Sequence, residues 1–174
     1  MLSAADKNYF DLFGLPVTFD LDVGGLSARY RELAREAHPD RFAGGSDFER
    51  RLAMQMTTLV NEAFRVLKNP ISRASYLLEL KGARAAYAAT VDPAFLVEQM
   101  ELRERLESVR GERDGLDALA RDVREALAER EQSLRLSLAP AQYQPERALR
   151  TVQEMQYLDK LRQQIADLED DIQQ

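Results

Sequence analysis

The chain contains no cysteine and no tryptophan, and it has a single histidine among its 174 residues. The absence of cysteine excludes disulfides, a thiol nucleophile and a zinc site built on thiolates. A single histidine excludes a metal site made of several histidines, and we expect neither a metal nor a cofactor. A chain without cysteine suits a reducing compartment, so we expect the protein in the cytoplasm.

Long hydrophobic runs are also missing. No segment approaches the about 18 consecutive apolar residues that indicate a membrane-spanning helix. The first residues, MLSAADKNYFDLFGLP, lack the basic segment and long apolar core of a secretory signal, and they have early acids and no arginine, unlike a transit peptide. We therefore expect no membrane partner and no cleaved leader.

Charge is unevenly distributed along the chain, whose net charge is −6. Residues 1–82 carry 11 Lys and Arg against 11 Asp and Glu, whereas residues 83–174 carry 13 against 19. An acidic second half argues against nucleic acid as the main partner, because binding to phosphates needs a basic surface. The imbalance indicates two regions with different roles, and an apolar share of 45% is enough to form a core.

The first half has the periodicity of helices. The segment NYFDLFG predicts a short helix that stops at Gly14 and Pro16. Apolar residues at helical spacing then predict two longer helices. The stripe of the first is Leu26, Tyr30, Leu33 and Ala37, and that of the second is Phe48, Leu52, Met56, Leu59, Ala63 and Val66. Pro39 ends the first of these two, because a residue before proline disfavours the helical conformation.

Asn69 and Pro70 offer a cap and a first residue for a fourth helix, which Gly82 stops. The segment GARAAYAATVD follows and has many small residues and weak periodicity, so we interpret residues 81–92 as a linker.

The second half predicts three helices joined by short turns. Asp92 and Pro93 signal the start of the first, glycines at 111 and 115 interrupt the pattern, and Pro145 opens the last. The stripes are Phe95, Leu102, Leu106 and Val109; then Leu116, Leu119, Val123, Leu127 and Leu134; then Leu158, Leu161, Ile165, Leu168 and Ile172. The prediction is an all-α chain, with a helical hairpin and short flanking helices in residues 1–80 and an antiparallel three-helix bundle in residues 93–174.

The only histidine lies in the sequence YRELAREAHPDRF. His38 and Asp40 could form an acid–base pair, but no nucleophile motif and no glycine-rich phosphate loop accompany them. A helix end capped by His38 and stopped by Pro39 is the simpler alternative. The preceding helix also carries Arg31 and Arg35 on one outer face, which is either a solvated surface or a docking edge for an acidic partner.

This motif, after YFDLFGL and before NEAFRVLKNPISRASYLL, resembles a J-domain. The resemblance implies that the His-Pro-Asp turn, His38 to Asp40, docks on a heat-shock chaperone of the seventy-kilodalton class and stimulates its ATPase. We call these three residues the HPD turn. By the same resemblance, basic residues steer the encounter; they are Arg31, Arg35 and Arg41, with Arg29 as a further contributor.

A second candidate site lies on the helix that begins near residue 93. Leu96, Val97 and Met100 fall on a different side of this helix from its core stripe, and Glu101 and Glu104 lie beside them. The last helix could cover these apolar residues, or they could be scattered surface residues without a role. The alternative is a protein-binding face, with methionine supplying adaptable packing.

The segments AFLVEQMELRERLE, YLDKLR and RASYLLELKG are similar to the HscB family, the J-domain co-chaperones of iron–sulfur cluster assembly. The resemblance covers nearly the whole chain and implies that the second domain binds the cluster scaffold IscU and delivers it to the chaperone HscA. It assigns what we call the scaffold face to Leu96, Val97, Met100, Glu101, Glu104 and Tyr157.

Three positions depart from the family pattern: Val97 replaces a common methionine, Ser108 an acid and Tyr157 a phenylalanine. The chain has no four-cysteine metal module, so it resembles the bacterial type.

Three other classes of function fit the sequence less well. A general J-domain co-chaperone would usually carry a Gly/Phe-rich linker or a cysteine-rich zinc region, and neither is present. A coiled-coil protein would need longer uninterrupted heptads than the glycine and proline turns allow. An enzyme would need a catalytic constellation that the chain lacks. We expect a monomeric, non-enzymatic co-chaperone.

Overall fold

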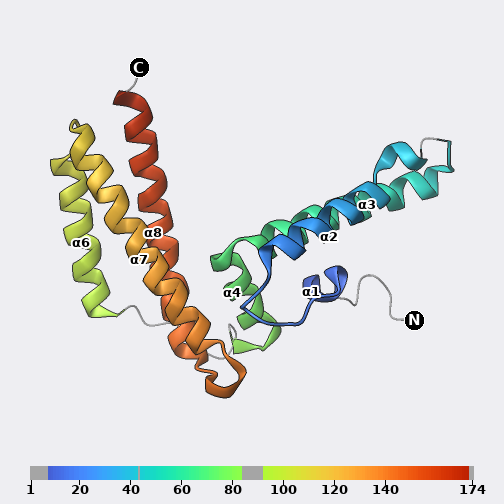
Figure 1. Ribbon diagram of the computed structural model, residues 1–174, viewed down its shortest axis with the longest axis horizontal. Coiled ribbons are helices and arrows are strands. Elements are labelled where there is room, and N and C mark those ends of the chain that lie inside the picture. The colour runs from blue at the N-terminus through green and yellow to red at the C-terminus, as the bar shows by residue number, and fades with distance from the viewer. Residues whose placement is uncertain (1–7, 43, 84–91, 173–174) are drawn as a thin grey trace. The chain divides into compact units, whose positions relative to one another are not determined.

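The structure is a computed structural model that describes residues 8–42, 44–83 and 92–172, and every regular element within these ranges is helical. The contacts divide the chain into two units, Met1–Leu77 and Leu78–Gln174. Most of the expected linker, residues 84–91, lies outside the described residues. Figure 1 shows the helices of both units.

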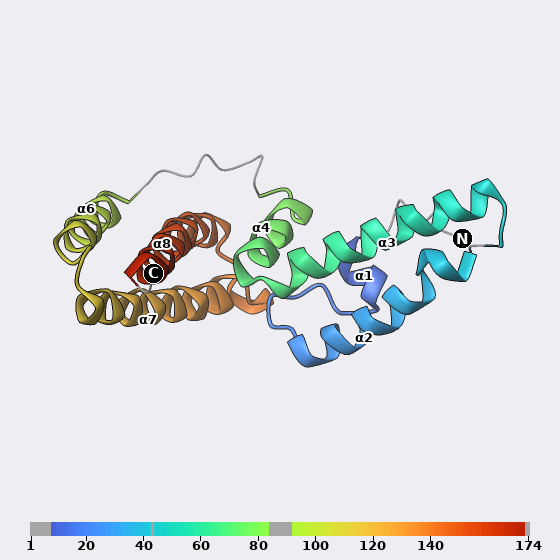
Figure 2. The ribbon, with the colours of Figure 1, turned by 90° about the horizontal axis from the view of Figure 1, so that it is seen from above.

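The first unit is built on the antiparallel hairpin of α2 (Val23–Glu36) and α3 (Asp47–Lys68), which lie side by side in Figures 1 and 2. A short α1 (Tyr9–Phe13) packs against both, and Gly14 ends it with a φ of 67°. That left-handed conformation favours glycine. Ser46 and Glu49 form a capping box at the start of α3.

The core of this unit confirms the predicted stripe of α2 but corrects that of α3. Leu26 of α2 and Ala37, which caps its end, are buried, whereas Phe48 and Leu52 of α3 are 68% and 51% exposed. Of the predicted stripe, Ala63 is buried, and the other buried positions of α3 are Ala53, Val60 and Leu67. Thr57 of α3 lies opposite the end of α2. The turns of α3 before Thr57 therefore extend past α2, and α2 cannot cover Phe48 and Leu52.

Helix α4 (Pro70–Leu80), within which the boundary between the two units falls, contacts the start of α1 and the end of α3. The Tyr76 ring stacks on Tyr9 at a centroid distance of 4.5 Å, and its hydroxyl accepts a hydrogen bond from the Tyr9 backbone N–H at 3.0 Å. The buried Arg73 guanidinium donates to the Leu67 carbonyl at 2.7 Å. A cation at the carboxyl end of α3 complements the negative end of the helix dipole.

The second unit is the predicted bundle of three long helices, α6 (Pro93–Ser108), α7 (Arg113–Ser137) and α8 (Pro145–Ile172). Asp92 caps α6 by accepting a hydrogen bond from the Ala94 N–H at 2.9 Å. A short 3₁₀ helix, η3 (Pro140–Gln142), joins α7 to α8. Figure 1 shows α7 antiparallel to both neighbours, so that α6 and α8 run in the same direction.

The predicted stripes form one hydrophobic core in this unit: Leu102, Leu106, Leu116, Leu119, Val123, Leu158, Leu161 and Ile165. Ile172, expected in the stripe of α8, is exposed, whereas Val152 and Met155 earlier in the helix are buried. Gly115 lies inside the first turn of α7, and a Cβ atom there would lie 2.7 Å from the Val109 Cβ. Glycine at this position therefore permits the close approach of the α6–α7 turn to α7.

None of the helices in the described ranges is both long and apolar enough to cross a bilayer.

Candidate docking sites

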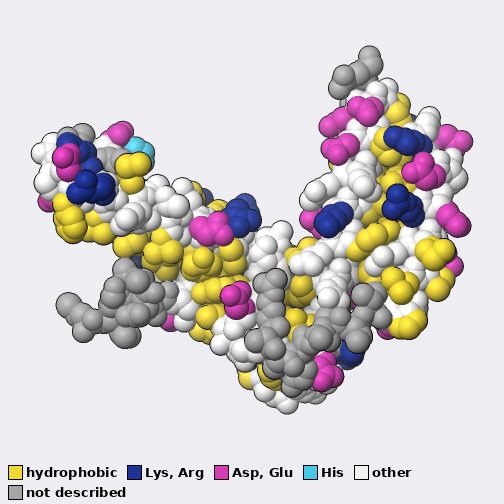
Figure 3. All heavy atoms as spheres, turned by 180° about the vertical axis from the view of Figure 1, so that it is seen from behind, with side chains coloured by type: hydrophobic (Ala, Val, Ile, Leu, Met, Phe, Trp, Pro, Cys, Tyr) yellow, Lys and Arg dark blue, Asp and Glu magenta, His cyan; other side chains and the backbone are white. Residues whose placement is uncertain are grey.

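The HPD turn lies on the surface between α2 and α3. A short 3₁₀ helix, η2 (Pro39–Phe42), begins within the turn, and the Arg41 N–H donates to the His38 carbonyl at 3.1 Å. The His38 Nδ1 atom accepts the Asp40 N–H at 3.3 Å and lies 3.6 Å from the Asp40 carboxylate. In the neutral imidazole, this acceptor role of Nδ1 leaves the proton on Nε2. The imidazole is exposed, and Figure 3 shows it in cyan next to an acidic side chain, with Lys and Arg side chains at the same end of the unit.

One residue before the turn, the backbone is anchored to the hairpin. Ala37 is buried, and its N–H donates to the Leu33 carbonyl at 2.9 Å. Its own carbonyl accepts the Thr57 hydroxyl of α3 at 2.9 Å. The turn is therefore held at its amino-terminal side by packing and hydrogen bonds, while the side chains of His38 and Asp40 point into solvent.

The arginines of the basic face fall into two groups. Arg29 pairs with Glu32 at 2.8 Å within the same helix. Arg31, Arg35 and Arg41 are exposed, and none of them forms an ion pair with any residue in the described ranges. Charges that are not neutralised locally act most strongly on an approaching partner. The expected steering role therefore fits Arg31, Arg35 and Arg41 better than Arg29.

The surroundings of the HPD turn offer little for catalysis. Both the imidazole and the carboxylate are exposed, and exposure keeps the local dielectric high. Among the described residues, no group of three or more acidic or histidine side chains is arranged to hold a metal. The turn presents a hydrogen-bond donor, a carboxylate and nearby cations on a fixed backbone, an arrangement that suits recognition by another protein.

The scaffold face of α6 is exposed as well. Leu96, Val97 and Met100 are 47%, 55% and 64% exposed, and Glu101 and Glu104 lie in solvent beside them. The same helix buries Phe95, Leu102 and Leu106 in the bundle. The three exposed apolar residues contribute little to the core, and together they form an apolar surface of the kind found at protein-binding sites.

Tyr157 of α8 joins the scaffold face to the bundle. Its ring makes an edge contact with Phe95 at a centroid distance of 5.8 Å, and its hydroxyl donates to the Gln99 carbonyl of α6 at 3.0 Å. Partial burial raises the pKa of Tyr157 above its ordinary value of 10.0, and the positive charge of Arg103 opposes this rise. Tyr157 therefore stays a neutral hydrogen-bond donor near pH 7. The hydroxyl that distinguishes it from phenylalanine fixes α6 against α8.

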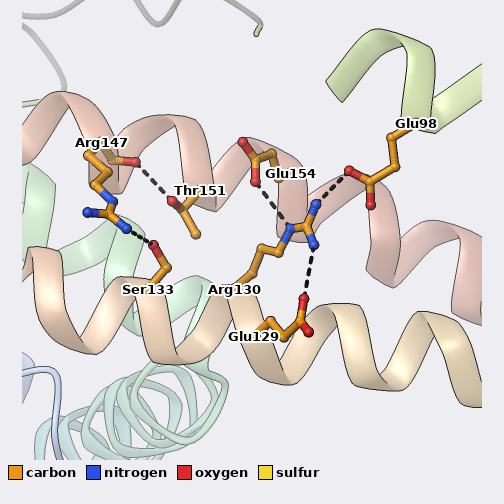
Figure 4. A network of polar contacts seen from close by, with 7 residues as sticks. All are labelled: Glu98, Glu129, Arg130, Ser133, Arg147, Thr151 and Glu154. Atoms are coloured by element: carbon orange, nitrogen blue, oxygen red, sulfur yellow. Dashed lines mark hydrogen bonds and ion pairs between the residues drawn. The ribbon is translucent and has the colours of Figure 1, made fainter. Parts of the chain in front are cut away.

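Behind the scaffold face, one guanidinium connects all three helices of the bundle (Figure 4). Arg130 of α7 donates to Glu98 of α6 at 2.6 Å and to Glu154 of α8 at 3.3 Å. Burial raises the pKa of Glu154, and the charge and hydrogen bond of Arg130 oppose this rise. Because Glu98 directly follows Val97, Arg130 holds the part of α6 that carries the scaffold face.

The structure thus brings Tyr157 to α6 and leaves the other residues of the scaffold face exposed on one helix. Arg130 could not be recognised from the sequence, because Glu98 and Glu154 are 32 and 24 residues from it. Its partners could not be found from helical spacing, which relates only residues within a few positions.

Comparisons with known proteins agree in both sequence and fold. The family model described as the HSCB C-terminal oligomerisation domain matches residues 91–166. The relative named "Co-chaperone protein HscB homolog" from Azoarcus sp. (strain BH72) is 44% identical over 165 residues, covering 92% of this chain and 93% of the relative. The relative of the same name from Cupriavidus taiwanensis is 47% identical over 131 residues, covering 73% and 74%.

Two solved structures have the same fold. "Chaperone HscB from Vibrio cholerae" is 37% identical, with a TM-score of 0.84, and the match covers 95% of this chain and 99% of that one. "Crystal structure of human co-chaperone protein HscB" is 27% identical, with a TM-score of 0.86, and the match covers 95% and 84%.

Proposed function

Because the chain belongs to the HscB family of co-chaperones, we propose that it brings an IscU-type iron–sulfur scaffold to an HscA-type chaperone in the cytoplasm and stimulates the ATPase of that chaperone. The first unit acts on the chaperone through the HPD turn and its basic face. The second unit binds the scaffold through the scaffold face. The chain itself then catalyses no reaction, since the hydrolytic site belongs to the chaperone.

The observation that carries this proposal is that exposed surfaces of different chemistry lie on different units. The first unit offers a turn with a histidine, a carboxylate and three cations without ion-pair partners in the described ranges. The second unit offers three exposed apolar side chains beside two carboxylates. Because each partner contacts its own unit, the chain can hold both proteins in one complex.

Calorimetric titrations of the chain with the purified scaffold alone and with the purified chaperone alone test this proposal. We expect each partner to bind without the other, and the chain to raise the steady-state ATPase rate of the chaperone. A chain that stimulates the ATPase but does not bind the scaffold would instead act as a general J-domain co-chaperone. A chain that binds neither protein would contradict the proposal.

A further inference from the structure

A groove runs between α6 and α8, beside the scaffold face. Its volume is ≈ 370 Å³, and Leu106, Leu161 and Leu168 form its apolar floor. Arg103 of α6 and Lys160 of α8 form its rims. Figure 3 shows this side of the unit, where a band of hydrophobic side chains runs along the bundle with Lys and Arg side chains next to it.

The two cations lie at the same level of the groove. The Tyr157 hydroxyl contacts the Gln99 carbonyl, which sets the register of the two parallel helices. Lys160 follows Tyr157 by three residues and Arg103 follows Gln99 by four, so each lies about one turn, or roughly 5 Å, further along its helix. Arg103 is close enough to the Tyr157 phenol to affect its pKa, which places its charge on the α8 side of α6.

Neither cation is neutralised within the described ranges. Arg103 and Lys160 are exposed and form no ion pair with any other described residue, whereas the other arginine of the groove, Arg110, lies 3.7 Å from Glu107. Two like charges on opposite rims repel each other, and an anion between them would interact favourably with both. The groove therefore has an apolar floor and a specific position for a negative group.

The far end of the groove has the opposite charge. Asp167 lies seven residues after Lys160 on α8, about 10 Å along the helix. The groove is thus basic next to Tyr157, whereas its far end, lined by Asp167 and the Glu107–Arg110 pair, carries one net negative charge. This polarity favours a bound segment whose carboxylate lies near Tyr157, and it disfavours a uniformly acidic segment.

The groove is continuous with the scaffold face, because Tyr157 belongs to both. Met100 of the scaffold face precedes Arg103 by three residues, so the two side chains are neighbours on the surface of α6. A protein bound to Leu96 and Met100 would therefore lie directly beside the two cations, Arg103 and Lys160.

We infer that the α6–α8 groove is a second part of the scaffold-binding surface, in which Arg103 and Lys160 bind a carboxylate of the scaffold while an apolar side chain of the same segment packs on Leu106 and Leu161. The inference rests on the proposed function. It adds that the part of the scaffold recognised by the groove is a segment with an acidic and an apolar side chain. The scaffold face supplies apolar affinity, and the groove selects for the charge and direction of the bound segment.

The double variant Arg103→Glu with Lys160→Glu tests the inference by titration against the purified IscU-type scaffold at several salt concentrations. We expect binding at least about 10-fold weaker, with a reduced salt dependence, since charge pairs at the rim of an interface are screened by salt. The matched control is Arg121→Glu with Arg124→Glu, which makes the same change in net charge on exposed residues of α7 that do not line the groove. We expect the control to change the affinity by less than about 2-fold.

Equal affinities of the groove variant and the control variant would overturn the inference. If Leu96→Ala with Met100→Ala weakens scaffold binding in the same experiment, the proposed function stands without the groove. If the unmodified chain does not bind the scaffold, the proposed function fails, and the inference fails with it. If a denaturant melt shows that the charge-reversed variant is unfolded, the neutral double variant Arg103→Gln with Lys160→Gln is tested in its place. An unchanged scaffold affinity of this neutral variant would also overturn the inference.

Discussion

The Thr57 hydroxyl donates a hydrogen bond to the Ala37 carbonyl across the α2–α3 hairpin, at 2.9 Å. It thereby fixes the residue that precedes His38. A position on α3, 20 residues away in sequence, thus controls where the HPD turn begins.

Thr57→Val keeps the shape of the side chain but removes this donor. We expect the free energy of unfolding to fall by about 1 kcal/mol, because the part-buried Ala37 carbonyl loses its partner, and we expect weaker stimulation of the chaperone ATPase. Urea melts and steady-state ATPase assays measure the two effects. Thr58→Val is the matched control, since the Thr58 hydroxyl donates only within its own helix, to the Met54 carbonyl at 3.0 Å. Equal behaviour of the two variants would refute the anchoring role.

His38→Gln is expected to abolish ATPase stimulation and to leave the melting curve unchanged. The imidazole is exposed and contributes little packing, so its loss affects the partner and not the fold. The measurement is an ATPase assay combined with thermal melts followed by circular dichroism. Full stimulation by a folded variant would exclude the HPD turn as the activating element.

Arg31→Ala with Arg35→Ala is expected to slow association with the chaperone and to flatten its dependence on salt, because steering charges act mainly on the association rate. Stopped-flow measurements at several salt concentrations test this. Arg29→Ala is the comparison within the same helix, and its effect should be smaller because Glu32 already neutralises Arg29. An unchanged salt slope in the double variant would show that these arginines are only solvated.

The triple variant Leu96→Ala, Val97→Ala, Met100→Ala is expected to weaken scaffold binding by at least about 10-fold, or 1.4 kcal/mol. Its stability should fall by less than the roughly 2–5 kcal/mol expected for one buried leucine. Leu102→Ala on the same helix is the buried control, and Leu136→Ala on α7 is the exposed control. Titration calorimetry measures the scaffold affinity, and urea melts measure the stability. In the absence of scaffold, the triple variant should still stimulate the chaperone ATPase. A large loss of stability with unchanged affinity would assign these residues to the core.

Glu154→Gln is expected to change how stability depends on pH. Burial raises the pKa of Glu154 in the folded chain above its ordinary value of 4.5, so the folded state binds this proton more tightly than the unfolded state does. The free energy of unfolding of the unmodified chain, relative to that of the variant, should therefore increase as the pH falls from about 7 towards 4.5. Urea melts across this range measure the difference. A difference that stays constant or decreases would contradict the expected direction.

The helices could be predicted from the sequence because their ends carry local signals. Gly14, Asn69, Gly82 and Asp92 lie at the helix ends that the sequence predicts, and the effect of each depends only on residues next to it in the chain. The predicted division at residues 1–80, 81–92 and 93–174 remains a prediction.

The core register of α3 could not be predicted in the same way. The large apolar residues at 48 and 52 suggested a stripe, but the exposed end of a helix depends on where its neighbour stops. The buried face of α3 also includes small residues, Ala53 and Ala63, which a search for large apolar residues does not weight. Periodicity gives the spacing of a buried face but does not give its length or its angular position.

The docking sites show the same difference between local and long-range information. The HPD turn and most of the scaffold face could be proposed from the sequence because their residues are adjacent in the chain or share a helix. The Arg130 connection and the α6–α8 groove each combine residues from helices that only the folded bundle brings together. Neither feature can be predicted from the residue pattern of one helix alone.

The sixteen-residue helix α6 carries two sets of apolar residues, one buried in the bundle and one exposed to solvent. Selection for folding therefore acts on Phe95, Leu102 and Leu106, whereas under the proposed function selection for a partner acts on Leu96, Val97 and Met100. Substitutions in the second group can accumulate without loss of the bundle. A lineage whose scaffold changes its surface can follow that change through three side chains of one helix, while the chain around them keeps its fold.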